Sequence, residues 1–158
     1  MNLIFDASTI RSYLDALTHQ RVVFTNGCFD LLHPGHVHYL TQAKALGDVL
    51  IVGLNSDASV KKIKGPHRPI NNHDFRAQML LGLKPVDAVV IFDDDTPIQM
   101  ISMIKPSIHV KGGDYTVELL PEYDAVVSNG GQVECLSFID GHSTSEIINK
   151  IIRQQTEV

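Results

Sequence analysis

Two histidines flank a Pro-Gly pair in the first quarter of the chain, at His33 and His36. Pro34 between them suits the first turn of a helix, where its missing N–H costs no hydrogen bond. In a helix that begins there, imidazoles three residues apart can point the same way near the N-terminus. Free N–H groups and the positive end of the helix dipole make that terminus an anion site. The spacing therefore favours phosphate chemistry, including stabilisation of the extra charge in a transition state.

Gly35 strengthens this interpretation, because it leaves space for a ligand to approach the backbone. Two other interpretations of the histidines stay open. A zinc site would use His33, His36 and His38, but His38 is offset on the helix by about 100° per residue, and no carboxylate or thiol completes an evident ligand set. Alternatively, the histidines are structural. The segment matches neither the Walker A loop nor GxGxxG, so no common phosphate motif accounts for it.

Three further segments carry groups that suit a phosphorylated ligand. A basic run, 61–68, holds Lys61, Lys62, Lys64, His67 and Arg68, and its Gly and Pro indicate a mobile loop that closes over phosphates. Lys-Gly-Gly-Asp at 111–114 favours a tight turn in contact with a base. Ser143-Thr144-Ser145-Glu146 forms a capping box whose helix start can bind phosphate. A solvated surface, a plain turn and a plain cap are the respective alternatives.

Alternating strand and helix patterns must position these segments. Short apolar runs predict strands at 22–25, 49–54, 87–92, 107–110 and 133–138. Helices are predicted at 7–18, 34–46, 73–83, 96–105 and 123–128, and from 143 onward. This order predicts an α/β, Rossmann-like, doubly wound and mostly parallel five-stranded sheet with helices on both faces. Ligands of such sheets bind beyond the carboxyl ends of the strands, where the strand order reverses.

Composition sets limits on the class of protein. The 158 residues are 44% hydrophobic and 20% charged, as in a globular protein, and we expect one domain over 1–158 with its core at about 21–152. Thirteen Lys and Arg against eighteen Asp and Glu give a net charge of −5, which argues against nucleic-acid binding. No apolar run approaches the roughly 20 residues that span a membrane. Two distant cysteines, Cys28 and Cys135, and the absence of a signal-peptide pattern predict a cytoplasmic protein.

The segment 27–36, Gly-Cys-Phe-Asp-Leu-Leu-His-Pro-Gly-His, resembles the signature of the HxGH nucleotidyltransferase superfamily, which includes the cytidylyltransferases. Segments 53–57, 64–70, 111–115 and 141–145, together with Arg76, extend the resemblance over 21–152. This series is similar to the heptose-1-phosphate adenylyltransferase family, which makes ADP-heptose. In that family the domain is often fused to a sugar kinase, and we expect no such kinase domain within these 158 residues.

The resemblance implies transfer of AMP from ATP to D-glycero-D-manno-heptose 1-phosphate, with release of pyrophosphate. One alternative is a cytidylyltransferase acting on glycerol 3-phosphate or another small alcohol phosphate, although the arginine that some of these enzymes carry near Phe138 is missing. Another alternative is a non-catalytic nucleotide-binding regulator. The resemblance further implies Mg²⁺ held mainly by phosphates rather than by protein ligands, a homodimer, and a separate heptose kinase in the pathway.

The resemblance also implies a role for each matching residue. The implied catalytic residues are His33, His36, Lys64 and Arg76. The residues implied to bind the nucleotide are Asn26, Gly27, Cys28, Phe29, Gly35, Lys111, Gly112, Asp114, Ser143, Thr144 and Ser145. Those implied to bind the sugar phosphate are Asp30, Asn55 and Arg68.

Overall fold

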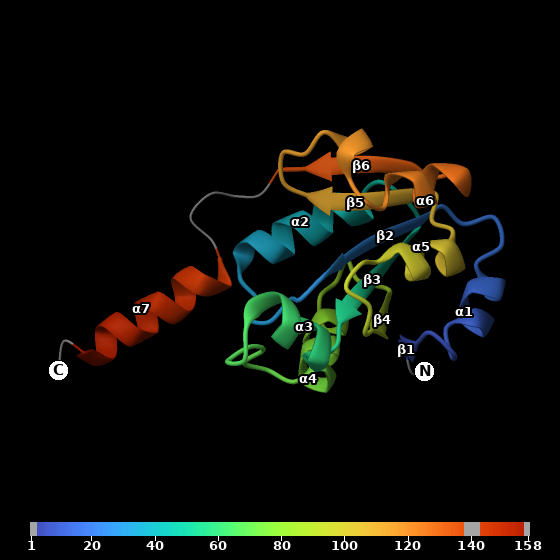
Figure 1. Cartoon of the computed structure of the whole chain (residues 1–158). Helices are drawn as coiled ribbons and strands as arrows, with labels where there is room; N and C mark the ends of the chain where they lie inside the picture. The colour runs from blue at the N-terminus through green and yellow to red at the C-terminus, as the bar shows by residue number, and fades with distance from the viewer. Residues whose placement is uncertain (1–2, 138–142, 157–158) are drawn as a thin grey trace.

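The structure is a computed structural model that describes residues 3–137 and 143–156. At its centre lies a six-stranded sheet in the order β1-β4-β3-β2-β5-β6, in which neighbouring strands are parallel (Figure 1). The strands are β1 (Ile4–Asp6), β2 (Val22–Gly27), β3 (Val49–Asn55), β4 (Ala88–Phe92), β5 (Ile108–Gly112) and β6 (Gln132–Leu136). A parallel sheet of this kind requires helical crossovers between its strands.

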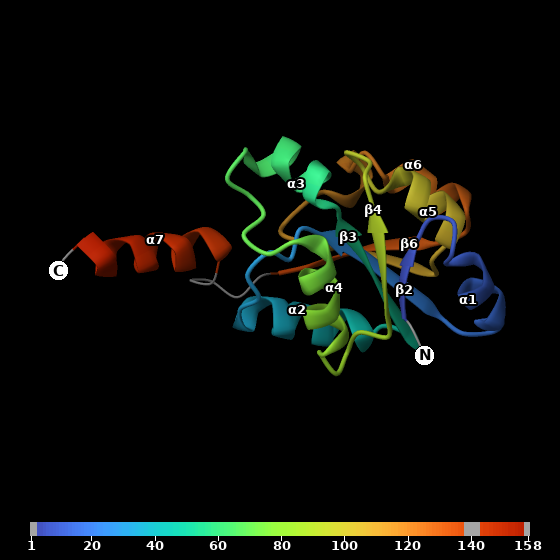
Figure 2. The same ribbon diagram turned by 90° about the horizontal axis from the view of Figure 1, so that it is seen from below.

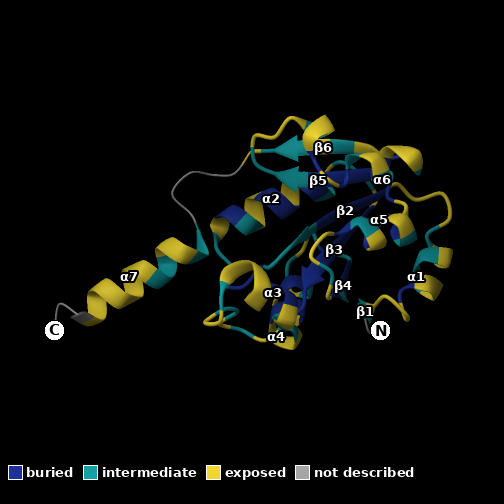
Figure 3. Cartoon of the chain, in the orientation of Figure 1, coloured by how far each residue is buried: buried dark blue, intermediate teal, exposed yellow. Residues whose placement is uncertain are grey.

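The helices form two layers around the sheet (Figure 2). They are α1 (Arg11–Ala16), α2 (Pro34–Lys44), α3 (Asp57–Lys64), α4 (His73–Leu81), α5 (Ile98–Ile104), α6 (Tyr123–Ser128) and α7 (Thr144–Thr156), with a short 3₁₀ turn η1 (Val117–Leu119). Side chains of α2 and α4 pack on one face, and those of α5 and α6 on the other. In both views α7 projects away from the sheet, and most of its described side chains are exposed (Figure 3).

Both faces of β3 are buried, which explains its continuous apolar sequence. Leu50, Val52 and Leu54 pack beneath α2 and α4. Val49 and Ile51 alternate with them and join the core on the opposite face. These contacts confirm the predicted doubly wound α/β fold.

The predicted elements differ from the structure in two main places. The sheet has six strands rather than five, because β1 was missed: it is only three residues long and pairs with β4 alone. The basic run was expected in a loop, but Lys61, Lys62 and Lys64 lie in the last turn of α3. Ser59 N–H donates to Ser56 Oγ at 3.2 Å and caps the start of that helix. Phe138, at the end of the last predicted strand, lies outside the described residues.

The order of the strands fixes where a ligand should bind. From β2 the chain adds β3 and β4 on one side, and it then crosses to place β5 on the other side of β2. The strand order therefore reverses between β2 and β5, whose carboxyl ends carry Asn26, Gly27, Lys111 and Gly112. Ligands of open α/β sheets bind in the crevice at such a switch point.

Candidate active site

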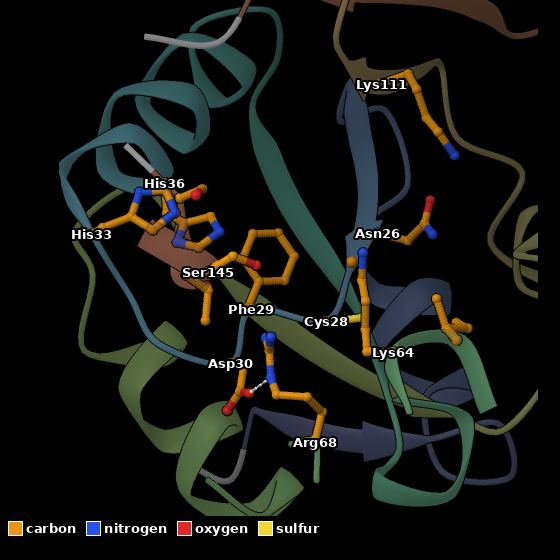
Figure 4. A pocket seen from close by; sticks show the side chains of 14 residues that line it. Asn26, Cys28, Phe29, Asp30, His33, His36, Lys64, Arg68, Lys111 and Ser145 are labelled. Atoms are coloured by element: carbon orange, nitrogen blue, oxygen red, sulfur yellow. Dashed lines mark hydrogen bonds and ion pairs between the residues drawn. The ribbon is translucent and has the colours of Figure 1, made fainter. Parts of the chain in front are cut away.

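A cavity of about 540 Å³ opens at this switch point (Figure 4). It is walled by the loop after β2, the start of α2, the end of α3, the end of β5 and the start of α7. Every lining residue except Ile63 is one that the sequence singled out. The lining comprises Asn26, Gly27, Cys28, Phe29, Asp30, His33, His36, Ile63, Lys64, Arg68, Lys111, Ser143, Thr144 and Ser145.

The two histidines lie together at the start of α2. His33 holds the N-cap position in an extended conformation, and its carbonyl accepts from the His36 N–H at 2.9 Å. Their rings stack with centroids 3.8 Å apart and an interplanar angle of 24°. Phe29 packs on His36 from the loop, with ring centroids 5.2 Å apart. The structure thus brings both imidazoles to one wall of the cavity, at a helix terminus suited to anions.

His36 is neutral at physiological pH. Burial, reinforced by the neighbouring His33, lowers the pKa of His36 to about 4. Its buried Nδ1 has no hydrogen-bonding partner among residues 3–137 and 143–156. An anion bound beside the ring would favour the protonated imidazole and raise the pKa again. The site is therefore set up to gain a hydrogen-bond donor when a phosphate arrives.

This low pKa predicts how stability depends on pH. The unfolded chain protonates His36 below about pH 6.5, whereas the folded protein does so only near pH 4. The stabilisation from neutral His36 is therefore complete above pH 6.5 and is lost as the pH falls through 4. We expect His36→Asn to flatten the rise in unfolding free energy between pH 4 and 6.5, measured by urea denaturation without ligand. Identical slopes for both proteins would contradict the assigned pKa.

Three Lys and Arg side chains of the described residues line the cavity, and two of them are compensated by carboxylates. Arg68 Nε lies 2.5 Å from Asp30 Oδ2, and Lys111 Nζ lies 2.7 Å from Glu122 Oε1. Lys64, by contrast, has no ion-pair partner in the described part of the chain. It is the last residue of α3, directly before Gly65, which adopts a positive φ of 97°. Lys64 therefore presents the least compensated positive charge of the three to a phosphorylated ligand.

Asp30 holds the segment after α3 against the loop after β2. Its carboxylate is buried and accepts from Arg68 Nε, from Ile70 N–H at 2.8 Å and from Asn71 N–H at 3.0 Å. These hydrogen bonds lower the pKa of Asp30, although burial alone would raise it. The sequence predicts that Asp30 binds the sugar phosphate. In the structure its oxygens already have partners, so we infer that it shapes the cavity wall.

Arg76 does not line the cavity, although it was predicted to contact the triphosphate. Its side chain is fully buried on α4. Nη1 donates to Cys28 O at 2.6 Å, Nη2 to Asp57 Oδ1 at 2.7 Å and Nε to Asn71 O at 2.9 Å. All three guanidinium nitrogens are thus engaged with the protein. This geometry favours a positioning role, in which Arg76 fixes the backbone of the loop after β2.

Other predicted residues also lie outside the main cavity. Asn55 is buried and donates to Ser59 Oγ at 3.0 Å, while Ser137 Oγ donates to Asp114 Oδ1 at 3.4 Å. Gly112 lines a smaller adjoining cavity of about 160 Å³. Gly35 is buried within α2. Gly141 and His142 lie outside the described residues.

The cavity thiol, Cys28, is not set up as a nucleophile. Burial raises its pKa, and this effect outweighs the opposing charges of Lys64, Arg76 and Arg68. Cys28 is therefore a thiol rather than a reactive thiolate at neutral pH.

The predicted capping box at the start of α7 is present in part, since Glu146 N–H donates to Ser143 Oγ at 3.1 Å. Thr144 Oγ1 donates to Leu31 O at 3.3 Å and ties α7 to the loop that carries the histidines.

Sequence reasoning missed two features of this site. Ile63 had no recognisable signal, because one apolar residue within a basic run looks like part of a solvated surface. Glu122 had no recognisable signal either, since a lone carboxylate before a short helix is ordinary.

Within the described residues, no group of three or more His, Cys, Asp or Glu side chains is arranged to hold a metal ion. In the same residues, no helix has the length and apolar character needed to cross a bilayer.

Known proteins resemble this chain in sequence. "Bifunctional protein HldE" of Geobacter metallireducens is 55% identical over 138 residues, which cover 87% of this chain and 28% of that protein. The protein of the same name from a Marinomonas species is 53% identical over 137 residues, covering 87% and 29% respectively. The chain thus spans less than a third of the length of these relatives.

Solved structures resemble it in fold. A lipopolysaccharide core biosynthesis protein from Thermoplasma volcanium superposes with a TM-score of 0.61 at 29% identity, covering 76% of this chain and 97% of that one. Pantoate–β-alanine ligase from Francisella tularensis gives a TM-score of 0.64 at 16% identity, covering 97% and 78%, and shares the fold alone. The cytidylyltransferase-like family matches residues 24–153, which include the paired histidines, both cavity lysines and the start of α7. The chain therefore belongs to the cytidylyltransferase-like family.

Proposed function

We propose that the protein transfers AMP from ATP to D-glycero-D-manno-heptose 1-phosphate, giving ADP-heptose and pyrophosphate. The observation that carries this proposal is the stacked His33–His36 pair at a helix N-terminus, in a cavity at the switch point of the sheet. Family membership supports nucleotidyl transfer. The motif series at 64–70 and 111–115, which resembles the heptose-1-phosphate adenylyltransferases, supports ATP and the sugar phosphate as substrates.

The reaction is direct in-line displacement. An oxygen of the sugar phosphate attacks the α-phosphorus of ATP, and the bond from that phosphorus to the β-phosphate bridging oxygen breaks. Pyrophosphate leaves with the electron pair. The attacking phosphate oxygen is already anionic at pH 7, so the reaction needs no strong base. His33 and His36 stabilise charge on the α-phosphate, and Lys64 offsets charge on the departing pyrophosphate.

Mg²⁺ fits this site as an ion bound by the substrate. Among residues 3–137 and 143–156, the one carboxylate that lines the cavity is Asp30, and its oxygens accept from Arg68 and two backbone N–H groups. Phosphate oxygens and water would therefore supply most of the ligands, as Mg²⁺ often requires. When bound, the ion would neutralise part of the triphosphate charge. The residues of this chain then orient the phosphates and exclude water.

Release of pyrophosphate, measured with ATP or CTP and a panel of sugar and alcohol phosphates, tests the proposal. We expect ATP with heptose 1-phosphate to give the highest kcat/KM. A higher value for CTP with glycerol 3-phosphate would instead assign a cytidylyltransferase. Tight nucleotide binding without turnover on any acceptor would favour a regulator.

Lys64→Ala is expected to lower kcat about 30-fold, equivalent to about 2 kcal/mol of barrier, while ATP affinity changes less. The reason is that charge moves toward the leaving pyrophosphate in the transition state, and an interaction that strengthens there raises kcat. Lys61→Ala is the matched control, because Lys61 lies on the same helix but does not line the cavity. Saturation kinetics and calorimetry separate the two effects. Equal, small changes in kcat and in ATP affinity for both variants would show that the lysines of α3 form only a solvated surface.

The remaining proposals concern the setting of the reaction. The two cysteines form no disulfide, which suits a reducing cytoplasm where ATP is abundant. From the family resemblance we also propose a homodimer. A separate kinase would supply the sugar 1-phosphate. Size-exclusion chromatography with light scattering tests the dimer directly.

A further inference from the structure

A polar cluster lies between β5 and the start of α6, and two of its three members are buried. It consists of His109, Lys111 and Glu122, and it joins β5 to the start of α6. Lys111 Nζ lies 2.7 Å from Glu122 Oε1, and His109 Nε2 lies 3.4 Å from the same oxygen. His109 is fully buried and Glu122 is 2% exposed. Burying a charged side chain this completely costs folding free energy unless it pairs with a neighbouring group.

The cluster is built to hold one orientation of the lysine. His109 and Lys111 are two residues apart on β5, so they lie on the same face of the sheet. Because a carboxylate only accepts, His109 donates its Nε2–H to Glu122. The His109 ring in turn stacks on Phe24 of β2, with centroids 5.6 Å apart. Phe24, His109 and Glu122 therefore form a rigid support for a side chain that otherwise has about 2 kcal/mol of rotamer entropy.

The supported lysine lies at the cavity wall. Lys111 lines both the main cavity and the smaller one beside it, whereas Glu122 and His109 line neither. The carboxylate stays ionised, because hydrogen bonds from His109 and Lys111 outweigh burial and lower the pKa of Glu122 to about 2. Its negative charge offsets that of Lys111. What remains at the cavity wall is an oriented N–H donor with little net charge.

The two cavity lysines therefore differ in chemistry. Lys64 has no ion-pair partner in the described part of the chain and suits a polyanion. A compensated donor such as Lys111 gains less from phosphate, and suits an uncharged acceptor such as a ring nitrogen or a ribose oxygen. The smaller cavity that Lys111 shares with Gly112 is also lined by Asn26, Gly27, Cys28, Phe29, His36 and Tyr39, so that among the described residues Lys111 is its one Lys or Arg.

We propose that Glu122, supported by His109, is a positioning residue that aims Lys111 at the uncharged nucleoside part of the nucleotide, and so sets nucleotide affinity rather than the rate of transfer. The inference rests on the proposed nucleotidyl transfer and assigns the two lysines to different parts of the nucleotide. Lys64 binds the phosphates, and Lys111, oriented by Glu122, binds the nucleoside.

The test compares competitive inhibition by adenosine and by tripolyphosphate, which probe the two halves of ATP separately. For Glu122→Gln we expect adenosine to bind about 10-fold more weakly, the scale of one lost hydrogen bond, with tripolyphosphate unchanged and kcat at saturation within twofold. Lys64→Ala should give the opposite pattern for the two inhibitors. Glu118→Gln, which removes the same charge from an exposed site four residues earlier, should change neither.

Combining substitutions separates positioning from a merely structural effect. The double variant Glu122→Gln with Lys111→Met should bind adenosine no more weakly than Lys111→Met alone, because the lysine through which Glu122 acts is already gone. An equal additional loss would overturn the proposal. If Glu122→Gln fails to fold, Lys111→Met alone must show the same split between adenosine and tripolyphosphate, and unchanged adenosine binding in that variant would overturn it.

The wild-type protein distinguishes failure of this inference from failure of the proposed function. If the wild type releases no pyrophosphate with any acceptor, the proposed function is wrong. If the wild type releases pyrophosphate and adenosine inhibits the wild type and Glu122→Gln equally well, the positioning role alone is wrong.

Discussion

His36→Ala is expected to lower kcat by roughly two to three orders of magnitude, the effect of losing one preorganised transition-state donor. His36 stacks on His33 at 3.8 Å, is held from the other side by Phe29, and lies in the first turn of α2. Its orientation is therefore fixed before substrate binds. Because burial keeps the free imidazole neutral, protonation of its ring is coupled to the arrival of phosphate charge.

The measurement is kcat at saturating ATP and sugar phosphate, with thermal unfolding to show that the variant folds. His38→Ala serves as the control, because His38 lies on the same helix but is exposed and outside the main cavity. We expect that variant to keep near-normal kcat. If His36→Ala folds and turns over at nearly the wild-type rate, the histidine pair is structural and the catalytic proposal loses its main support.

The sequence predicted the positions around the cavity well, because most of them follow strand ends. In a parallel sheet, residues after separate strands meet at one edge whatever their distance in the chain. Asn26 near the end of β2 and Lys111 near the end of β5 meet in this way. The turn chemistry of Pro34 and Ser143 placed two helix starts at the same edge. Which strands pair did not have to be known for this inference.

Partnerships between side chains were harder to predict. Asp30 carries a carboxylate next to the paired histidines, and its sequence position favours contact with a ligand. Only the folded chain shows that Arg68 and the N–H groups of Ile70 and Asn71 occupy it. Glu122 illustrates the same limit, because its partner Lys111 is known only once α6 has packed against the end of the sheet.

The prediction of secondary structure failed where the local sequence pattern and the tertiary contacts favoured different structures. The run after β3 has three lysines within four residues, which reads as a solvated loop. Yet Val60 is buried and Ser56 caps the segment, so it forms α3. The strand β1 contributes only three residues at the sheet edge, too few to show a periodic pattern. In both places the missing information is contact with the sheet rather than local propensity.

Arg76→Met is expected to lower the free energy of unfolding by about 3 kcal/mol, the lower end of the scale for breaking a buried ion pair, because Arg76 is fully buried whereas Asp57 is part-buried. The substitution keeps the apolar stem but leaves Asp57 Oδ1 and the carbonyls of Cys28 and Asn71 without their guanidinium donor. Arg11→Met is the matched control. Its ion pair with Asp15 is exposed, with side chains 70% and 64% accessible, and such pairs contribute little.

Urea denaturation of both variants measures the two effects, and kinetics of the folded fraction show what Arg76 does for the reaction. Because its nitrogens are engaged with the protein, we expect the loss of stability to exceed any loss of transition-state stabilisation. Adding Asp57→Asn should recover part of the lost stability, since it removes the carboxylate charge that has lost its guanidinium partner. Wild-type stability with a 100-fold lower kcat would show instead that Arg76 leaves these partners to contact the triphosphate, as the sequence resemblance implies.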